Sequence, residues 1–193
     1  MPKRFGHMPG RDKAKKFTVF TVGHSTRAIE EFLELLEAHG VRRVIDVRTI
    51  PRSRHNPQFN RDSLASSLRA AGISYTHLKK LGGLRHPKRD SINLVWRNSG
   101  FRGFADYMQT PEFETGLARA MKLAKTKASA LLCAEAVPWR CHRSLISDAL
   151  LVRKIPVEHI LSRTRAQSHK ITPFAHVRGT RITYPQETPH RTP

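Results

Sequence analysis

The residues that could do chemistry or contact a ligand fall just after four short apolar runs of this 193-residue chain. In chain order they are His24 and Ser25, then Asp46 and Arg48, then Lys79, Lys80, Gly82 and Gly83, and finally Cys133 and Glu135. A second group, Arg140, Cys141, His142 and Arg143, stands directly before a helical pattern. Carboxylates and histidines can transfer protons or activate water, and a cysteine beside arginines at a helix start is a candidate thiolate. The chain therefore carries the groups for acid–base or thiol chemistry.

The apolar runs alternate with helical spacing, and this alternation predicts where those groups lie. β-branched and aliphatic residues predict strands at 17–22, 43–47, 73–76, 128–133 and 157–161. Helical periodicity predicts helices over 29–40, 60–72, 110–124 and 145–150. Such alternation is typical of right-handed βαβ units. We expect a Rossmann-like α/β fold, a three-layer α/β/α sandwich with a mainly parallel sheet of about five strands. Because ligands bind at the carboxyl edge of such sheets, the strand-end groups should meet there.

The sequence predicts a single domain flanked by two basic segments. We expect this domain over residues 17–161, a basic arm over 1–16 and a basic, proline-containing extension over 162–193. The extension has few apolar residues and no periodicity, which predicts loose packing or disorder. No apolar run approaches the roughly 20 residues of a membrane helix, and the first residues lack the apolar centre of a secretion signal. With only two cysteines, we expect a cytoplasmic protein with free thiols and no membrane contact.

The formal charge of +20 comes from 35 basic and 15 acidic residues, and it is unevenly spread. Residues 42–102 hold 14 basic and three acidic residues, whereas the remainder of 17–161 is close to neutral. This pattern favours nucleic acid as the partner, DNA rather than RNA, over a protein that is merely basic. The candidate contacts are Arg48, Arg52, Arg54, Arg61, Lys79, Lys80, Arg85, Lys88, Arg89, Arg140 and Arg143.

Several short motifs, taken in their order along the chain, resemble those of a known protein family. They are Thr21-Val22-Gly23-His24-Ser25, Val44-Ile45-Asp46-Val47-Arg48, Pro51-Arg52-Ser53, Phe59, Tyr75, Leu78, Leu81-Gly82-Gly83, Leu132-Cys133-Ala134-Glu135, Pro138 and Cys141-His142-Arg143. Residues 17–161 resemble the bacterial and archaeal family of unknown function numbered 488, which implies membership but no activity. A weaker similarity is to rhodanese-like and low-molecular-weight phosphatase folds. However, six residues rather than five separate Cys133 from Arg140, and the loop has no glycine to cradle a phosphate.

Together these features favour an enzyme that takes a nucleotide out of DNA and acts on its base or glycosidic bond. The candidate catalytic groups are Glu135, Asp46, His142, His24, Cys141 and Cys133, and the candidate substrate contacts are Ser25, Gly82, Gly83 and Trp139. Each group also has a structural interpretation: Asp46 can pair with Arg48, and Cys133 can be a core residue. Glu135 is the carboxylate we most expect to act, because its loop also holds Pro138 and Trp139.

Three other interpretations stay open. A DNA- or RNA-binding module without catalysis would use the basic residues alone. A thiol-dependent phosphatase or sulfurtransferase would use Cys133 or Cys141. Metal binding could draw on Cys133, Glu135, Cys141, His142 and His24, but the spacing lacks the Cys-x2-Cys pairing of structural zinc. On a helix, adjacent Cys141 and His142 would point apart, so we expect no metal and no cofactor.

Overall fold

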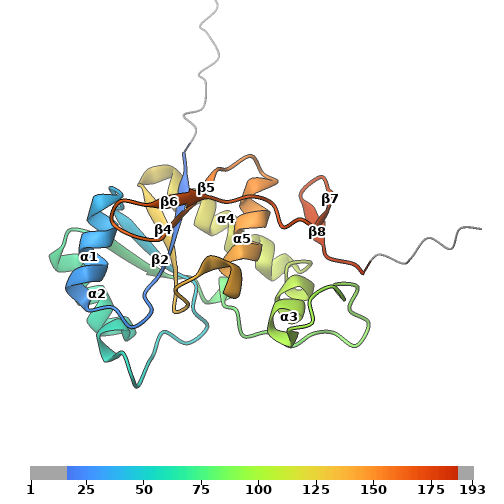
Figure 1. Ribbon diagram of the computed structural model, residues 1–193, viewed down its shortest axis with the longest axis horizontal. Coiled ribbons are helices and arrows are strands. Elements are labelled where there is room, and N and C mark those ends of the chain that lie inside the picture. Colours follow the sequence, from blue (N-terminus) through green and yellow to red (C-terminus); the bar gives the residue numbers. More distant parts are fainter. Residues whose placement is uncertain (1–16, 187–193) are drawn as a thin grey trace, which may run out of the picture.

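The computed structural model describes residues 17–186 and shows the expected α/β sandwich (Figure 1). Within these residues a six-stranded sheet has the order β3-β2-β4-β1-β5-β6, and its strands are parallel except for β6. The strands are β1 (Val19–Gly23), β2 (Arg43–Asp46), β3 (Ser74–His77), β4 (Ser129–Cys133), β5 (Val157–Ile160) and β6 (Ala166–Ser168). The mainly parallel sheet is confirmed, and β6 adds an antiparallel strand that the sequence does not predict.

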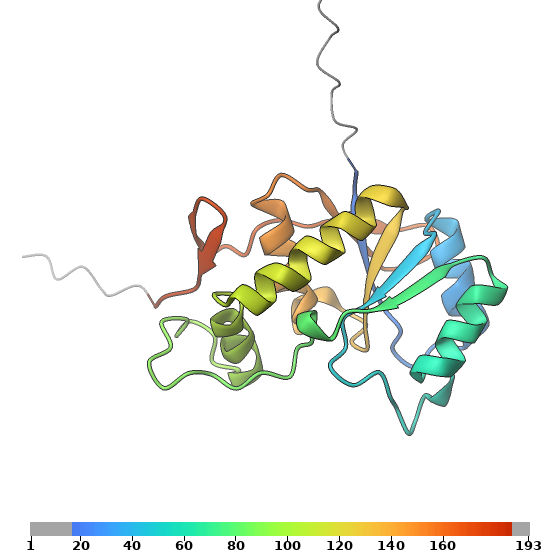
Figure 2. The same cartoon turned by 180° about the vertical axis from the view of Figure 1, so that it is seen from behind.

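Helices cover both faces of the sheet (Figure 2). The first face carries α1 (Ile29–Ala38) and α2 (Arg61–Ala70), and the second carries α4 (Pro111–Thr126) and α5 (Arg143–Leu151). The helix α3 (Ser99–Tyr107) lies beyond the sheet and packs against α4 through Phe104 and Phe113. Successive strand residues point to opposite faces. On β4, Leu132 therefore packs among the first set of helices and Leu131 among the second. β1, β2, β4 and β5 each place side chains in both apolar cores, which is why a strand such as β4 is apolar on both of its faces.

The helix α3 lies in a stretch that the sequence presents as a glycine- and arginine-rich connection. The side chain of Asn98 caps its first turn by accepting a hydrogen bond from the Phe101 amide at 3.1 Å. Gly103 lies against the backbone of Arg85, where a Cβ would collide with that carbonyl. Packing of Phe104 into the second core then stabilises a helix whose intrinsic propensity is low.

The chain after Ser162 is packed against the domain over residues 162–186, so the expected loose packing is wrong there. β6 extends the sheet, and β7 (His176–Arg178) pairs with β8 (Arg181–Thr183) in a hairpin. Ile182 and Tyr184 are buried in the second core. The fully buried carboxylate of Asp148 on α5 accepts hydrogen bonds from the hydroxyls of Thr172 and Tyr184, at 2.6 and 2.8 Å. Strand pairing, two buried apolar side chains and hydrogen bonds to a buried carboxylate together hold a segment that lacks periodicity.

The expected basic arm over residues 1–16 and the end of the C-terminal extension, 187–193, lie outside the described residues. In the described part of the chain, none of the helices combines the length and the apolar character needed to cross a bilayer.

Three short 3-10 turns complete the chain path: η1 (Pro57–Phe59), η2 (Lys79–Leu81) and η3 (Pro138–Arg140). Each lies in a loop that follows the carboxyl end of a strand, after β2, β3 and β4 respectively. The loops at this edge are thus structured turns, able to hold side chains in place.

Candidate functional site

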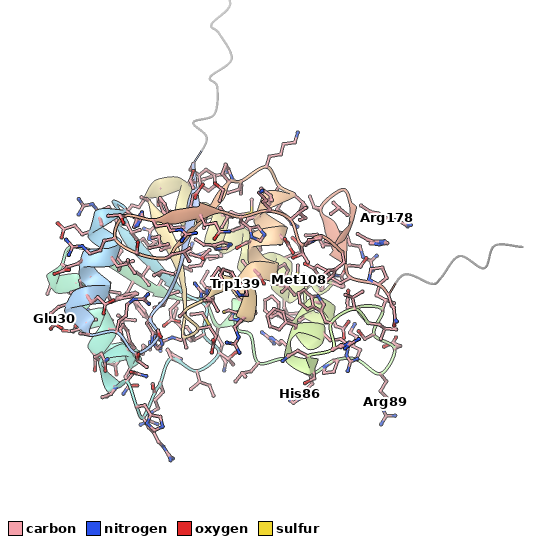
Figure 3. The ribbon with its side chains drawn as sticks, in the orientation of Figure 1. Glu30, His86, Arg89, Met108, Trp139 and Arg178 are labelled. Carbon is pink, nitrogen blue, oxygen red and sulfur yellow. The ribbon has the colours of Figure 1, made fainter. Side chains whose placement is uncertain are left out.

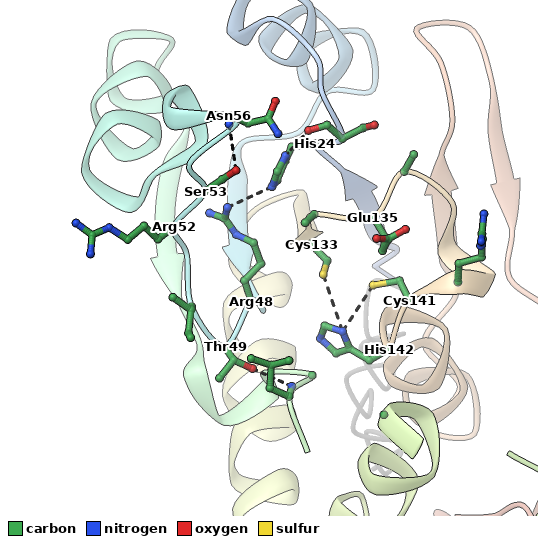
Figure 4. A pocket seen from close by; sticks show the side chains of 18 of the residues that line it. His24, Arg48, Thr49, Arg52, Ser53, Asn56, Cys133, Glu135, Cys141 and His142 are labelled. Carbon is green, nitrogen blue, oxygen red and sulfur yellow. Dashed lines mark hydrogen bonds between the residues drawn. The ribbon is translucent and has the colours of Figure 1, made fainter. Parts of the chain in front are cut away.

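A pocket of about 680 Å³ opens at the carboxyl edge of the sheet (Figure 4). Strand register brings the strand ends together there: Gly23 of β1 pairs with Cys133 of β4, and Asp46 of β2 pairs with Leu132. The predicted site residues that line the pocket are His24, Ser25, Arg48, Arg52, Gly83, Cys133, Glu135, Arg140, Cys141 and His142. Groups from both halves of the sequence therefore meet in one cavity.

Backbone hydrogen bonds join the loop after β1 to the loop after β4. The amide of His24 donates to the carbonyl of Cys133 at 3.0 Å, and the amide of Ser25 donates to Ala134 at 2.8 Å. Gly23 permits this approach, because a Cβ there would overlap the backbone carbonyl of Glu135. Ser25 itself has a φ of 52°, in the left-handed region that costs a non-glycine residue energy. The two loops are consequently held as one wall of the pocket.

Asp46 is fully buried beneath the pocket and does not line it. Its carboxylate accepts hydrogen bonds from Arg48 Nη2 at 2.6 Å, Arg48 Nε at 2.9 Å, the Arg48 amide at 3.0 Å and the Tyr75 hydroxyl at 2.8 Å. Burial works to lower the pKa of Arg48, but the ion pair with Asp46 outweighs it and raises that pKa. Asp46 thus acts on the pocket through Arg48, whose guanidinium reaches the lining.

Arg48 continues the chain of contacts to His24. Arg48 Nη1 lies 3.3 Å from His24 Nε2, and His24 Nδ1 lies 2.7 Å from the carbonyl oxygen of Ser25. A carbonyl only accepts and a guanidinium only donates, so the proton of a neutral His24 resides on Nδ1. Burial lowers the pKa of His24 to about 4, with the nearby Arg48 charge acting in the same direction. His24 is therefore a neutral group, stacked on Phe59 with ring centroids 4.3 Å apart.

Two sulfur atoms and one imidazole nitrogen converge on the opposite side of the pocket (Figure 4). His142 Nδ1 lies 3.6 Å from Cys141 Sγ and 3.9 Å from Cys133 Sγ. His142 Nε2 lies 3.1 Å from the carbonyl oxygens of both Val47 and Leu81. Because carbonyls only accept, Nε2 carries the proton and Nδ1 presents its lone pair to the sulfur atoms.

The two thiols differ in acidity. A hydrogen bond from the Cys133 thiol lowers the pKa of Cys141 well below its ordinary value, and the positive charge of Arg143 acts in the same direction. Donating that bond raises the pKa of Cys133 well above its ordinary value, and burial adds to the rise. Of the two candidate nucleophiles, Cys141 is therefore the more acidic.

The expectation that Cys141 and His142 point apart is wrong. It assumed that both residues lie within a helix, but α5 begins only at Arg143. Cys141 has an extended backbone with φ −136° and ψ 144°, and His142 has φ −55° and ψ −12°. This change of backbone conformation between neighbours turns both side chains toward Cys133.

Arg143 lies beneath the pocket wall with 1% of its surface exposed. Its guanidinium donates to the backbone carbonyl of Glu135, and its Nε lies 3.4 Å from Cys141 Sγ. The expected contact with nucleic acid does not fit this burial. Arg143 instead holds the loop after β4 and places a positive charge beside the Cys141 sulfur.

Comparison with known families identifies the matched part of the chain. The family described as domain of unknown function DUF488 matches residues 28–150. The chain belongs to the DUF488 family. The matched segment runs from the residue before α1 almost to the end of α5, and it contains Arg48, Glu135 and the two cysteines but not His24. Comparison with curated proteins and with solved structures gives no match.

The predicted nucleic-acid contacts in the DUF488 segment differ in exposure and in their position relative to the pocket. Arg52 and Arg140 are exposed and line the pocket. The side chains of Arg54, Arg61, Lys79, Lys80, Lys88 and Arg89 are also exposed but do not line it. Figure 3 shows Arg89 pointing into solvent, far from Trp139. Arg85 is held by its own contacts, with Cζ 3.5 Å from the centre of the Tyr107 ring. Fewer exposed cations therefore line the pocket than the sequence predicts.

Glu135 stands at the mouth of the pocket and is exposed. Its carboxylate forms no hydrogen bond or ion pair with residues 17–186, which leaves it available to a ligand. The two remaining expected substrate contacts lie elsewhere. Gly82 is buried against Thr49, and Trp139 is 61% exposed beside a second hollow that also involves Trp96 and Phe174.

Two apolar residues at the pocket mouth escaped the sequence analysis. Ile50 and Leu84 line the pocket with 63% and 70% of their surface exposed. A hydrogen bond of 3.0 Å from the Leu84 amide to the Thr49 hydroxyl joins their two loops. Their sequence signal is an isolated aliphatic residue within a basic loop, where no core periodicity accounts for it.

Proposed function

We propose that this DUF488 protein is an enzyme that binds DNA and accepts an extruded nucleotide in the pocket, where it acts on the base or the glycosidic bond. The observation that carries the proposal is the composition of the pocket mouth. Exposed cations and exposed apolar side chains stand together around a cavity that holds the carboxylate of Glu135, which has no partner among residues 17–186. Ligand pockets for small molecules usually have volumes of roughly 300–1,000 Å³, and this pocket, at about 680 Å³, falls in that range.

The mouth offers the two kinds of contact that extrusion needs. Arg52 and Arg140 can neutralise backbone phosphates, which sets affinity without reading sequence. Ile50 and Leu84 can enter the base stack in place of the displaced nucleotide, as apolar wedges do in proteins that unstack DNA. Exposed aliphatic side chains on a cationic rim have little structural use, so a stacked, anionic ligand explains both.

Inside the pocket, Glu135 is the group we assign to proton transfer. As a carboxylate it would activate water or stabilise positive charge on the sugar, an effect typically worth about 10² to 10⁴ in rate. Arg48 and neutral His24 would bind the nucleotide, and Asp46 would position Arg48. We also propose a cytoplasmic location, because the thiols of Cys133 and Cys141 are free and suit a reducing compartment.

The test compares binding and turnover in the full chain. Fluorescent duplex oligonucleotides with normal, mismatched, deaminated or alkylated bases serve as probes, and mass spectrometry detects released base. The variant Arg52→Glu/Arg140→Glu should weaken binding at least tenfold and reduce the slope of log affinity against log salt by about 2. The matched control is Lys122→Glu/Lys125→Glu on the last part of α4, which precedes the amino end of β4 and lies at the opposite edge of the sheet.

Glu135→Gln separates catalysis from binding. It should abolish base release and leave affinity within about twofold, because the carboxylate supplies proton transfer rather than phosphate contacts. Equal losses of affinity in the two charge-reversal variants would overturn the proposed interface. Strong salt-dependent binding without product from any probe would instead identify a binding module without catalysis.

A further inference from the structure

We propose that Cys133, Cys141 and His142 form a binding site for a transition metal ion of the zinc class, with one coordination position open to the pocket. The ligand atoms of these three residues all lie within 4.8 Å of one another. Among residues 17–186, this is the one cluster of three or more such residues that comes so close. The inference is independent of the proposed substrate, because it concerns the ion that the pocket wall would hold.

The separations fit tetrahedral coordination. Zinc–sulfur bonds of about 2.3 Å and zinc–nitrogen bonds of about 2.0–2.1 Å place a sulfur and a nitrogen ligand about 3.6 Å apart at the tetrahedral angle. The observed distances from His142 Nδ1 are 3.6 Å to Cys141 Sγ and 3.9 Å to Cys133 Sγ. Both nitrogen–sulfur distances therefore lie within a few tenths of an ångström of the separation that coordination requires.

Hydrogen bonds and packing contacts hold the imidazole of His142 in an orientation suited to metal coordination. Metal-bound histidines usually donate their other N–H to a carbonyl or carboxylate, which fixes the tautomer and the ring orientation. His142 does this with the carbonyls of Val47 and Leu81, leaving the Nδ1 lone pair directed at the sulfur atoms. Gly83 lies against the same ring, where a Cβ would overlap it, and Phe104 packs on it with ring centroids 4.9 Å apart. The ring is thus held on several sides in a donor orientation.

The donor set selects the ion and the kind of site. Two thiolates and one imidazole are ligands that favour zinc over magnesium or calcium, which prefer oxygen. Two thiolates also balance a divalent charge. Three protein ligands are typical of catalytic zinc sites, in which water or substrate takes the fourth position. All three ligands line the pocket, so that position would face the cavity that contains Glu135.

The test measures metal in the untagged full chain without any nucleic acid, so its outcome does not depend on the proposed DNA chemistry. After equilibration with ZnSO₄ and gel filtration, elemental analysis should find about one zinc per chain. Cys133→Ser, Cys141→Ser and His142→Ala should each lose this zinc. His86→Ala, which removes an exposed histidine from another loop, should keep it.

A second measurement needs no substitution and therefore does not depend on how well the variants fold. Replacing zinc by Co²⁺ in the wild-type chain should give the visible absorption of tetrahedral cobalt and a sulfur-to-cobalt charge-transfer band. Zinc should also protect Cys141 from alkylation by iodoacetamide. A wild-type chain that retains no zinc and shows no cobalt spectrum would overturn the proposal. Rapid alkylation of Cys141 with zinc present would overturn it too and would identify a thiol centre.

Discussion

Replacing Asp46 by asparagine tests whether this residue stabilises the fold through Arg48. Asp46 is fully buried and Arg48 is 6% exposed, so the two charges face each other almost without water. The substitution removes the negative charge and puts an amide NH₂ among donors, since Arg48 and the Tyr75 hydroxyl both point at the carboxylate. It leaves a guanidinium buried without its counter-charge.

The expected cost follows from the burial. Breaking a buried ion pair by removing one partner destabilises a protein by about 3–5 kcal/mol. At about 1.4 kcal/mol per factor of ten, the unfolding equilibrium constant should rise by roughly two to four orders of magnitude. Arg48→Met should also destabilise the fold, because it leaves the carboxylate unpaired. The double variant should lose less unfolding free energy than the sum of the losses in the two single variants, since both partners are then absent.

Urea unfolding followed by circular dichroism measures these changes. Asp90→Asn is the matched control, because Asp90 is exposed and its substitution should alter the free energy of unfolding by no more than about 0.5 kcal/mol. A loss below about 1 kcal/mol for Asp46→Asn would refute the reasoning, since it would mean that the pair is not ionised and buried as described.

Two further predictions concern stability. Tyr184→Phe should lower the free energy of unfolding by about 1–3 kcal/mol, because Asp148 loses a buried donor at 2.8 Å. Truncation after Ser162 should lower the melting temperature further, and an unchanged melting temperature would contradict the packing of the C-terminal segment. Burial lowers the pKa values of His24 and His159 from 6.5 to about 4, so between these values the unfolded chain holds more protons than the folded one. Each histidine should therefore remove about 3 kcal/mol of stability as pH falls from 6.5 toward 4. Urea unfolding at a series of pH values measures this loss, and a flat profile across that range would count against it.

The sequence by itself determined the layered α/β architecture. Strand and helix periodicities are local properties, and runs such as Ala130-Leu131-Leu132 are apolar on both sides because the sheet is covered on both faces. The same local logic placed chemically capable residues after strands. Since parallel strands end at one edge, the meeting of His24, Arg48 and Cys133 followed from topology alone.

Only the tertiary structure decided what each of these residues does. Asp46 and Arg143 resemble site residues in the sequence, yet both are buried: Asp46 accepts a hydrogen bond from the hydroxyl of Tyr75 on β3, and Arg143 donates to the carbonyl of Glu135. The direction of His142 depends on the carbonyls of Val47 and Leu81, far away in the chain. Docking of the C-terminal segment depends on a few residues such as Tyr184, which meets one buried carboxylate. A periodic pattern repeats over many residues and is visible in the sequence, whereas a single long-range hydrogen bond leaves no repeat to detect.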